Sequence, residues 1–239
     1  MFDDTRVGMA GSVFVDVTAP AVTATRLDTA LDPPRAVTSR GHYERFIKPV
    51  IDRAGAAVLL VVFLPVMFIV AAVVRISLGR GVIFKQQRIG RNGSRFCVYK
   101  FRTMHPDARR AQLPIDGPDR RVSHKSRNDP RLTPVGRSLR GWSLDELPQL
   151  WNVLRAEMSL VGPRPEIPAV VERYQPWQNT RHLVKPGLTG YWQVRARGDG
   201  RLMHECADLD IAYVKSIGFV TDLKILALTI PALLIRRGF

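Results

Sequence analysis

Cysteine is almost absent from this sequence of 239 residues, in which Cys97 and Cys206 are the only two. Thiols so far apart form neither a closely spaced metal-binding motif nor the disulfide framework of a small secreted domain. The chain has no internal repeat, and its length suits one domain with a sizeable core. We therefore expect the bulk of the chain to lie in the reducing cytoplasm.

Acidic residues are also scarce, because 21 Asp and Glu stand against 36 Lys and Arg and leave a formal net charge of +15. Such an excess indicates an anionic partner: a nucleic acid, a phosphate-bearing substrate or an acidic membrane surface. Charge alone does not choose among the three.

The first 41 residues lack a sustained apolar pattern and are rich in Thr, Ala, Pro and Arg. They also lack the apolar stretch of a secretory signal. A segment with so little apolar surface cannot offset the entropy lost on ordering. We expect residues 1–41 to form a flexible tail.

Charge is missing altogether from residues 54–74, "AGAAVLLVVFLPVMFIVAAVV", a run of 21 residues. A straight helix of this length measures about 31 Å, close to the thickness of a bilayer core. The run predicts a membrane anchor within residues 42–78. The alternative, a buried core helix, would need a large protein around it on all sides.

Pro65 lies at the midpoint of this run, and the flanks on both sides are basic. A proline removes one backbone hydrogen bond and kinks a helix. A spanning helix would carry one basic flank across the membrane, against the positive-inside bias. We therefore expect a re-entrant hairpin and not a full span.

The remainder of the chain carries alternating signals for strands and helices. Apolar alternation on both sides of "GRNG" predicts a β-hairpin near residues 82–98, and the polar stretch 105–130, broken by Pro and Gly, predicts a long loop. "DELPQLWNVLRAEM" has the apolar spacing of an amphipathic helix. For the apolar run at 225–235, a helix on the membrane surface and ordinary core packing both remain open.

The stretch "SLDELPQLWN" places the adjacent acids Asp145 and Glu146 near a helix start. Ser143 and Glu146 match a capping box, but Pro148 would then fall in the second turn, where it lacks the required N–H. The helix therefore begins near Pro148 or opens with an irregular turn. In either case the two carboxylates lie at the positive end of a helix dipole, where anions also bind.

Arginines surround these acids in the sequence. Arg131, Arg137 and Arg140 precede them, and Arg164 follows between two prolines in "GPRPE". A guanidinium fork suits phosphate oxygens, which makes a diphosphate substrate plausible. The alternative is a set of structural ion pairs between these arginines and the acids Asp145, Glu146, Glu157 and Glu166.

The chain contains, in order, "FKQQRIGRNG", "YKFRTM", "DPRLTPVGRSLRGWSLDELPQLWNVL", "MSLVGPRPE" and "VKPGLTGYWQV". In sequence and order, these stretches resemble the bacterial sugar transferases that load a phosphosugar onto polyprenol phosphate, the monotopic phosphoglycosyl transferases. The resemblance covers about residues 42–239. It implies a catalytic domain at 79–239, carried by the anchor at 42–78.

By motif position, the resemblance assigns the role of nucleophile to Asp145 and that of its partner to Glu146. It implies Mg²⁺, with Asp145 as the metal ligand, and a covalent aspartyl phosphosugar intermediate. Lys100 and Arg102 of "KFRTM", with Arg140 and Arg164, are the candidate substrate-binding residues. For Lys100 and Arg102, a purely structural role remains the alternative.

The resemblance also implies the partners and the location. The implied partners are a nucleotide sugar, expected to be a UDP-sugar, polyprenol phosphate and membrane lipids, and no nucleic acid. Homodimerisation is left open. The site would face the cytoplasm at the bacterial inner membrane, at the first membrane step of exopolysaccharide, capsule, O-antigen or glycoprotein glycan assembly. The fold class expected is α/β: a compact, mostly helical domain with a small β-hairpin, the Pro-kinked re-entrant helix and surface amphipathic helices.

Three departures from the usual family pattern occur. Arg80-Gly81 stands where many relatives have Gly-Pro, Leu64 stands where they have Ser, and Ala156-Glu157 replaces Gly-Asp or Gly-Glu. Only Leu64 bears on the predicted hairpin. None affects Asp145.

A non-catalytic, membrane-anchored basic binding protein is the alternative function. Its cations would be attracted to an acidic leaflet. Against it, the basic residues are spread among prolines, glycines and acids and form no known nucleic-acid motif. Nothing in the sequence specifies the sugar.

Overall fold

The structure, a computed structural model, describes residues 41–105, 129, 131–196 and 206–234. The predicted tail at 1–41 and the predicted loop at 105–130 therefore lie almost entirely outside the described residues. The helical elements are η1 Tyr43–Ile47, α2 Lys48–Leu78, η2 Arg91–Gly93, α3 Pro134–Gly141, η4 Leu144–Glu146, α4 Gln149–Leu154, α5 Pro168–Val171, η5 Pro176–Leu183, α6 Tyr191–Arg195, α7 Ala207–Ser216 and α8 Phe219–Leu234. The strands are β1 Ile83–Ile89, β2 Arg95–Phe101, β3 Ser159–Val161 and β4 Gly187–Thr189.

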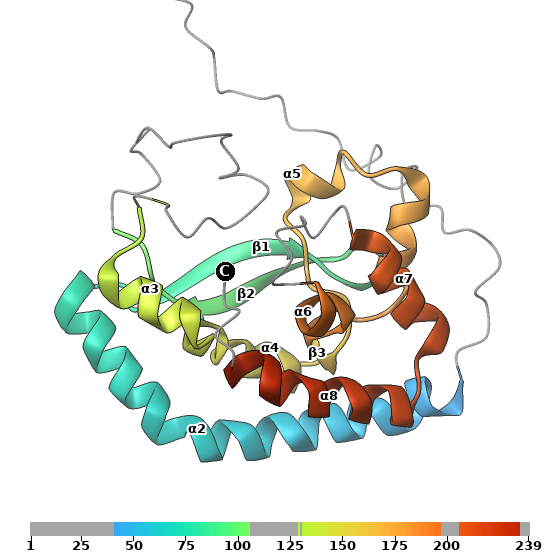
Figure 1. Ribbon diagram of the computed structural model, residues 1–239, viewed down its shortest axis with the longest axis horizontal. Helices are drawn as coiled ribbons and strands as arrows, with labels where there is room; N and C mark the ends of the chain where they lie inside the picture. Colours follow the sequence, from blue (N-terminus) through green and yellow to red (C-terminus); the bar gives the residue numbers. More distant parts are fainter. Residues whose placement is uncertain (1–40, 106–128, 130, 197–205, 235–239) are drawn as a thin grey trace, which may run out of the picture.

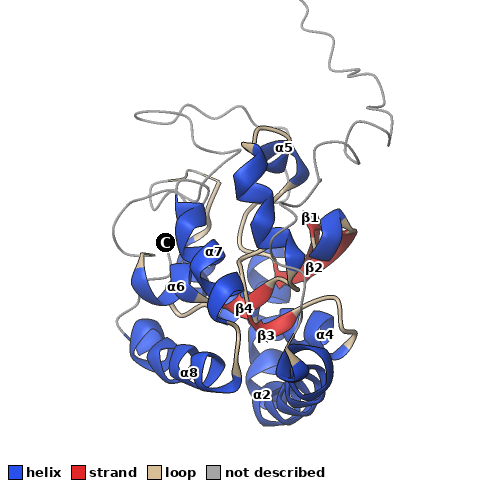
Figure 2. Ribbon diagram, turned by 90° about the vertical axis from the view of Figure 1, so that its right-hand side faces the viewer, coloured by secondary structure: helices blue, strands red, loops and turns tan. Residues whose placement is uncertain are grey.

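The described part of the chain is mostly helical, with two small sheets (Figures 1 and 2). Strands β1 and β2 form the antiparallel hairpin that the sequence predicts, in a register that pairs Ile83 with Phe101 and Ile89 with Arg95. Its turn uses positive φ angles at Asn92 (53°) and Gly93 (76°), which Asn and Gly tolerate best. The hairpin and the mostly helical character are confirmed.

A second sheet was not expected. Strands β3 and β4 pair in parallel, with Ser159 opposite Gly187 and Val161 opposite Thr189. Each strand has three residues, too few to show an alternating pattern in the sequence. This small sheet lies in the main hydrophobic core, which includes Leu150, Val153, Met158 and Val161.

Within the described ranges, Tyr43–Leu78 is the one helix long and apolar enough to cross a membrane. Many of its large apolar side chains are exposed, so the protein does not surround it as a core helix would be surrounded. Helix α2 continues through Pro65 without a break. Ala56 packs in the main core, whereas Val70 and Val74, beyond Pro65, pack in a second cluster with Phe101.

Figure 1 shows α2 changing direction along its course. Both of its ends are attached to the same folded body. At the N-terminal end, the Lys48 ammonium lies 2.6 Å from the Asp222 carboxylate of α8, and the Asp52 carboxylate accepts from Leu160 N at 3.1 Å. At the C-terminal end, the Arg102 guanidinium donates to the carbonyls of Leu78 and Gly79.

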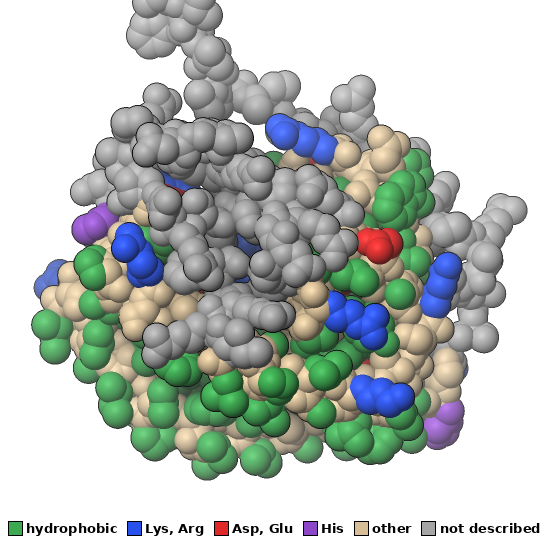
Figure 3. Space-filling view, in the orientation of Figure 1, with side chains coloured by type: hydrophobic (Ala, Val, Ile, Leu, Met, Phe, Trp, Pro, Cys, Tyr) green, Lys and Arg blue, Asp and Glu red, His purple; other side chains and the backbone are tan. Residues whose placement is uncertain are grey.

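Helix α8 confirms core packing for one face of the C-terminal apolar run, and its place on a membrane surface stays a prediction. Ile225 is fully buried in the main core. The other face exposes large apolar side chains, namely Phe219, Val220, Leu223, Leu228, Ile230, Leu233 and Leu234. Helices α2 and α8 lie along the same edge of the molecule in Figures 1 and 2, and Figure 3 shows apolar side chains along that edge.

Asp222 is the junction between α8 and the first turns of the anchor. It is 5% exposed and accepts hydrogen bonds from Tyr43 Oη at 2.8 Å, Lys48 Nζ at 2.6 Å and Tyr213 Oη at 2.8 Å. Tyr213 Oη also lies 3.0 Å from the Val161 carbonyl of β3. Elements η1, α2 and α7 are therefore each joined to α8 through one buried carboxylate.

Replacing Asp222 by Ala should lower the free energy of unfolding by about 3 kcal/mol, because it leaves the buried Lys48 ammonium without its close partner. Chemical denaturation of the protein in lipid nanodiscs measures the change. Asp208→Asn on exposed α7 surface is the matched control and should change little. A loss for Asp222→Ala no larger than that of the control would contradict the structural importance of this junction.

Candidate active site

The chain makes an irregular turn between α3 and α4, and this turn carries both acids. Ser143 adopts a left-handed conformation (φ 56°), Leu144–Glu146 form a single 3-10 turn, and α4 begins at Gln149 with Pro148 as its cap. The Ser143 side chain makes no capping hydrogen bond, so the capping-box interpretation is wrong. The predicted irregular turn, with the helix beginning next to Pro148, is confirmed.

Helix α3 is fixed in front of this turn by close packing on the end of β2. Thr133 Oγ1 accepts from Gly136 N at 2.9 Å, and Pro134 occupies the first helical position. A Cβ atom on Gly136 would come within 1.9 Å of the Thr103 carbonyl oxygen, so only glycine allows this approach. As a result Arg140, one turn further, donates from Nε to Thr103 Oγ1 at 3.0 Å.

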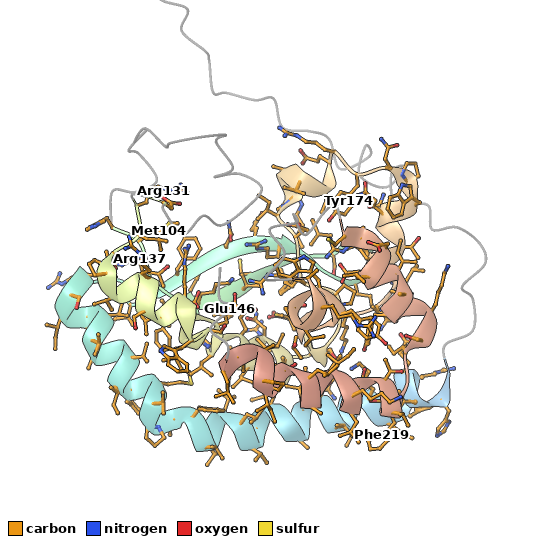
Figure 4. All side chains as sticks on the ribbon, viewed as in Figure 1. Met104, Arg131, Arg137, Glu146, Tyr174 and Phe219 are labelled. Atoms are coloured by element: carbon orange, nitrogen blue, oxygen red, sulfur yellow. The ribbon has the colours of Figure 1, made fainter. Side chains whose placement is uncertain are left out.

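Glu146 is the centre of a buried charge cluster (Figure 4). Its Oε1 lies 3.1 Å from Lys100 Nζ on β2. Arg164 approaches with both arms of its guanidinium, Nη2 at 2.5 Å from Oε1 and Nη1 at 3.2 Å from Oε2. The carboxylate of Glu146 thus holds two of the four predicted substrate-binding cations next to the turn.

The surroundings shift the pKa values of these cations in opposite directions. Burial lowers the pKa of Lys100 to about 8, although Glu146 opposes the fall. Burial would also lower the pKa of Arg164, but Glu146, Asp145 and Glu166 together outweigh it and the pKa is raised. Both side chains therefore carry positive charge at neutral pH.

Asp145 is placed differently from its neighbour. The residue is 3% exposed, and among the described residues no hydrogen bond to its carboxylate is found. Its charge nevertheless acts on three cations: it opposes the fall in the pKa values of Lys100 and Arg140 that burial causes, and it adds to the rise in the pKa of Arg164. The two carboxylates therefore differ: cations bind both oxygens of Glu146, whereas the described residues leave the Asp145 oxygens available to a further hydrogen-bond donor or cation.

Arg140 has a spare donor close to this carboxylate. The residue is 8% exposed, and its Nη1 is buried with no hydrogen-bond partner in the described ranges. Burial lowers the pKa of Arg140, and the negative charges of Asp145 and Asp129 oppose this fall. Asp129 is itself paired with Arg131 at 2.6 Å. An unpaired guanidinium nitrogen in this position suits an anionic oxygen.

The structure does not bring every predicted cation to the turn. The Arg102 guanidinium contacts the carbonyl oxygens at the end of α2, so the interactions seen for it are with the anchor. Arg137 is exposed on α3. The phosphate role of Arg102 stays a prediction. Of the structural ion pairs considered for these arginines, the one between Arg164 and Glu146 is present, whereas Glu157 pairs with Arg155, at 3.2 Å, which was not predicted.

Two arginines near the site were not predicted from the sequence: Arg181 is buried, and Arg88 is partly buried. Arg88 of β1 donates to the Pro165 carbonyl at 3.1 Å, lies 3.8 Å from Glu166, and has its pKa lowered to about 10 by burial. Arg181 of η5 donates to the Arg164 carbonyl at 2.7 Å. Arg88 lies in the quoted stretch "FKQQRIGRNG", but a strand pattern by itself does not reveal which loop an arginine contacts.

The donor set around the turn can be tested against the expected Mg²⁺. Among the described residues, no group of three His, Cys, Asp or Glu side chains could hold a metal. Both oxygens of Glu146 are engaged by cations, whereas no hydrogen bond to the Asp145 oxygens is found from the part of the chain that the structure describes. Mg²⁺ is commonly bound by one or two carboxylates together with substrate phosphates and water. Asp145 therefore fits as a single protein ligand that would share the ion with a diphosphate.

Comparison with known proteins adds a second kind of evidence. Residues 43–236 match the family described as bacterial sugar transferase. The exopolysaccharide production protein ExoY of Rhizobium meliloti (strain 1021) is 40% identical over 193 residues, covering 78% of this chain and 85% of that protein. The UDP-glucose:undecaprenyl-phosphate glucose-1-phosphate transferase of Caulobacter vibrioides is 41% identical over 194 residues, covering 78% of this chain and 69% of that protein.

Some relatives are much longer than the matched region. The UDP-galactose-lipid carrier transferase of Erwinia amylovora is 39% identical over 204 residues, which cover 82% of this chain and 42% of that protein. The present chain thus spans less than half the length of this curated relative.

Glu146→Gln should lower the free energy of unfolding by about 3 kcal/mol, because Lys100 and Arg164 would then lie close together without their nearest counter-charge. Chemical denaturation in nanodiscs measures the difference. Glu172→Gln, on an exposed position, is the matched control. Should the two variants prove equally stable, the charge cluster would not depend on Glu146 in the way the contacts indicate.

Proposed function

Because this chain belongs to the bacterial sugar transferase family, we propose that it transfers a sugar 1-phosphate from a UDP-sugar to polyprenol phosphate. The transfer would take place at the cytoplasmic face of the bacterial inner membrane, as the first membrane step of exopolysaccharide or a related glycan. Names of relatives include both a glucose and a galactose transferase, so the sugar is left open.

One observation carries the proposal: Asp145 has a buried carboxylate with no hydrogen-bond partner in the described residues, surrounded by the cations Lys100, Arg140 and Arg164. A carboxylate is repelled by a diphosphate in water. Here the cations offset the charge of both groups, and phosphoryl transfer depends chiefly on such positioning and neutralisation. The site therefore suits nucleophilic attack by Asp145 on phosphorus.

The reaction has two steps. In the first, an Asp145 carboxylate oxygen attacks the phosphorus that carries the sugar, the bond from this phosphorus to the bridging oxygen breaks, and UMP leaves with the electron pair. In the second, a phosphate oxygen of polyprenol phosphate attacks the same phosphorus, and the Asp145 oxygen leaves as a free carboxylate. The covalent aspartyl phosphosugar divides one difficult transfer into two easier ones.

The other residues bind and orient. Glu146 keeps Lys100 in place and binds one N–H of each arm of the Arg164 fork; the remaining N–H groups of Arg164 and the spare Nη1 of Arg140 would then serve phosphate oxygens. Mg²⁺, held by Asp145 and the substrate phosphates, would supply further positive charge. A basic membrane-binding protein, the rival interpretation, would need only exposed cations. It would not need a buried carboxylate surrounded by fixed cations.

The lipid substrate requires that the site be held at the bilayer surface. Both ends of α2 are attached to the same folded body, through Lys48 and Asp222 at one end and Arg102 at the other. Ends attached to one domain favour a helix that enters and leaves the same leaflet, in agreement with the basic flanks. The exposed apolar face of α8 would lie beside it in the interface.

The transfer predicts a covalent adduct on Asp145. Protein in nanodiscs without polyprenol phosphate, given Mg²⁺ and a panel of UDP-sugars, should gain the mass of one phosphosugar and release a stoichiometric burst of UMP. Asp145→Asn should do neither, because a neutral amide of nearly the same shape lacks the nucleophilic charge. Intact-protein mass spectrometry and a UMP assay follow the reaction.

The Asn variant must be checked for folding and for deamidation. Continued exchange of labelled UMP into UDP-sugar by folded Asp145→Asn would rule out the covalent role of this residue. Release of no UMP by the wild-type protein with any sugar of the panel would favour the binding-protein alternative.

The membrane topology makes a separate prediction. In a variant lacking Cys97 and Cys206, cysteines introduced at Ser39 and at exposed Ser94 should both react with a membrane-impermeant reagent only from the cytoplasmic side. Labelling of the two sites in right-side-out and inverted vesicles measures this. Reaction at position 39 from the outside would mean a spanning helix.

A further inference from the structure

The loop that carries Arg164 is held by an unusual set of donors. Four successive carbonyl oxygens accept hydrogen bonds: Pro163 from Gly187 N at 2.8 Å, Arg164 from Arg181 Nη2 at 2.7 Å, Pro165 from Arg88 Nη1 at 3.1 Å and Glu166 from Ile89 N at 2.9 Å. Two of the donors are backbone groups and two are guanidinium groups of side chains.

The prolines explain why side chains are needed here. Pro163 and Pro165 have no N–H, so the segment cannot pair with a neighbouring strand through a regular ladder. A carbonyl left without a donor in this buried loop would cost free energy and leave the loop free to shift. Arg181 supplies the donor for the carbonyl of Arg164 itself.

Arg181 is positioned by groups far from Glu146 in the sequence. It is 1% exposed in η5, and its guanidinium lies 2.5 Å from the carboxylate of Asp210 on α7, which is also 1% exposed. It also donates to Tyr174 Oη and lies over the Tyr174 ring. Burial raises the pKa of Asp210 to about 6, Arg181 opposes the rise, and the pair is charged at neutral pH.

A buried ion pair of this kind is a poor way to gain stability. Taking both charges out of water costs about as much free energy as their attraction returns, and apolar side chains of similar size often stabilise more. The pair does supply a rigid donor at a defined place. Fixed placement of Arg164 has chemical value, because small displacements of a phosphate ligand reduce transfer rates strongly.

We propose that Arg181, held by Asp210, is a positioning residue that sets the place of Arg164 for phosphate binding. The proposal rests on the proposed function, in which Arg164 contacts substrate phosphate. Arg181 itself touches no substrate: its effect passes through the Arg164 backbone to the fork on Glu146.

A double-mutant cycle tests this chain of contacts. Arg181→Lys keeps the positive charge beside Asp210 but cannot bond Tyr174, Asp210 and the Arg164 carbonyl with the same fork. It should slow adduct formation by about tenfold in the wild-type background. In an Arg164→Lys background the same change should slow it less than about twofold, because the group it positions has been removed.

Tyr174→Phe is the matched control. It removes the hydrogen bond that the Arg181 guanidinium donates to Tyr174 Oη. The hydrogen bond from Arg181 Nη2 to the Arg164 carbonyl is kept. It should lower stability without a comparable loss of rate. The proposal would be overturned if Arg181→Lys slowed adduct formation equally with Arg164 and with Lys at position 164. It would also be overturned if Tyr174→Phe and Arg181→Lys were equally stable and lost the same amount of rate.

Binding of inorganic pyrophosphate separates this proposal from the proposed transfer. Calorimetry on the same four proteins of the cycle should show Arg181→Lys weakening pyrophosphate binding only where Arg164 is present. If pyrophosphate shows this coupling while no phosphosugar adduct forms, the positioning role stands and the transfer fails. A wild-type protein that neither binds pyrophosphate nor forms the adduct would overturn both.

Discussion

The paired interaction of the Glu146 carboxylate with Lys100 and Arg164 is the contact on which the rest of the site depends. It joins strand β2, the turn before α4 and the proline-flanked loop after β3, three segments that are separate in the sequence. Each of the three charges would be costly if buried alone. The cluster of one acid and two cations keeps one net positive charge, and this charge offsets that of the adjacent buried Asp145.

The anchor is joined to this centre by contacts of the same kind. Asp222 gathers Tyr43, Lys48 and Tyr213, and Tyr213 reaches the carbonyl of Val161 just before the loop that carries Arg164. At the other end of α2, Arg102 in the strand extension that follows Lys100 bonds the last carbonyls of the helix. The apolar helix is therefore connected at both ends to the segments that form the site, and under the proposed function its placement in the membrane would be coupled to the placement of the charges.

Parts of this arrangement follow from local patterns. The hairpin was predictable because alternation and the "GRNG" turn are local signals, and the apolar helix because 21 residues without charge allow few alternatives. The irregular turn at Asp145 was predictable because Pro148 conflicts with a regular helix. The three-residue strands β3 and β4 were not, since such short pairings are decided by what surrounds them.

The sequence by itself determined the long apolar helix, the hairpin, the acidic pair and the excess of cations around it. Only the tertiary structure decided which acceptor each cation contacts: Lys100 and Arg164 contact Glu146, Arg181 contacts Asp210, and Arg102 contacts backbone carbonyls at the end of α2. Arginines in a sequence are chemically alike, and their different roles come from long-range contacts. Burial then gives each pair its strength, because a charge removed from water interacts strongly only with the partner that the fold places beside it.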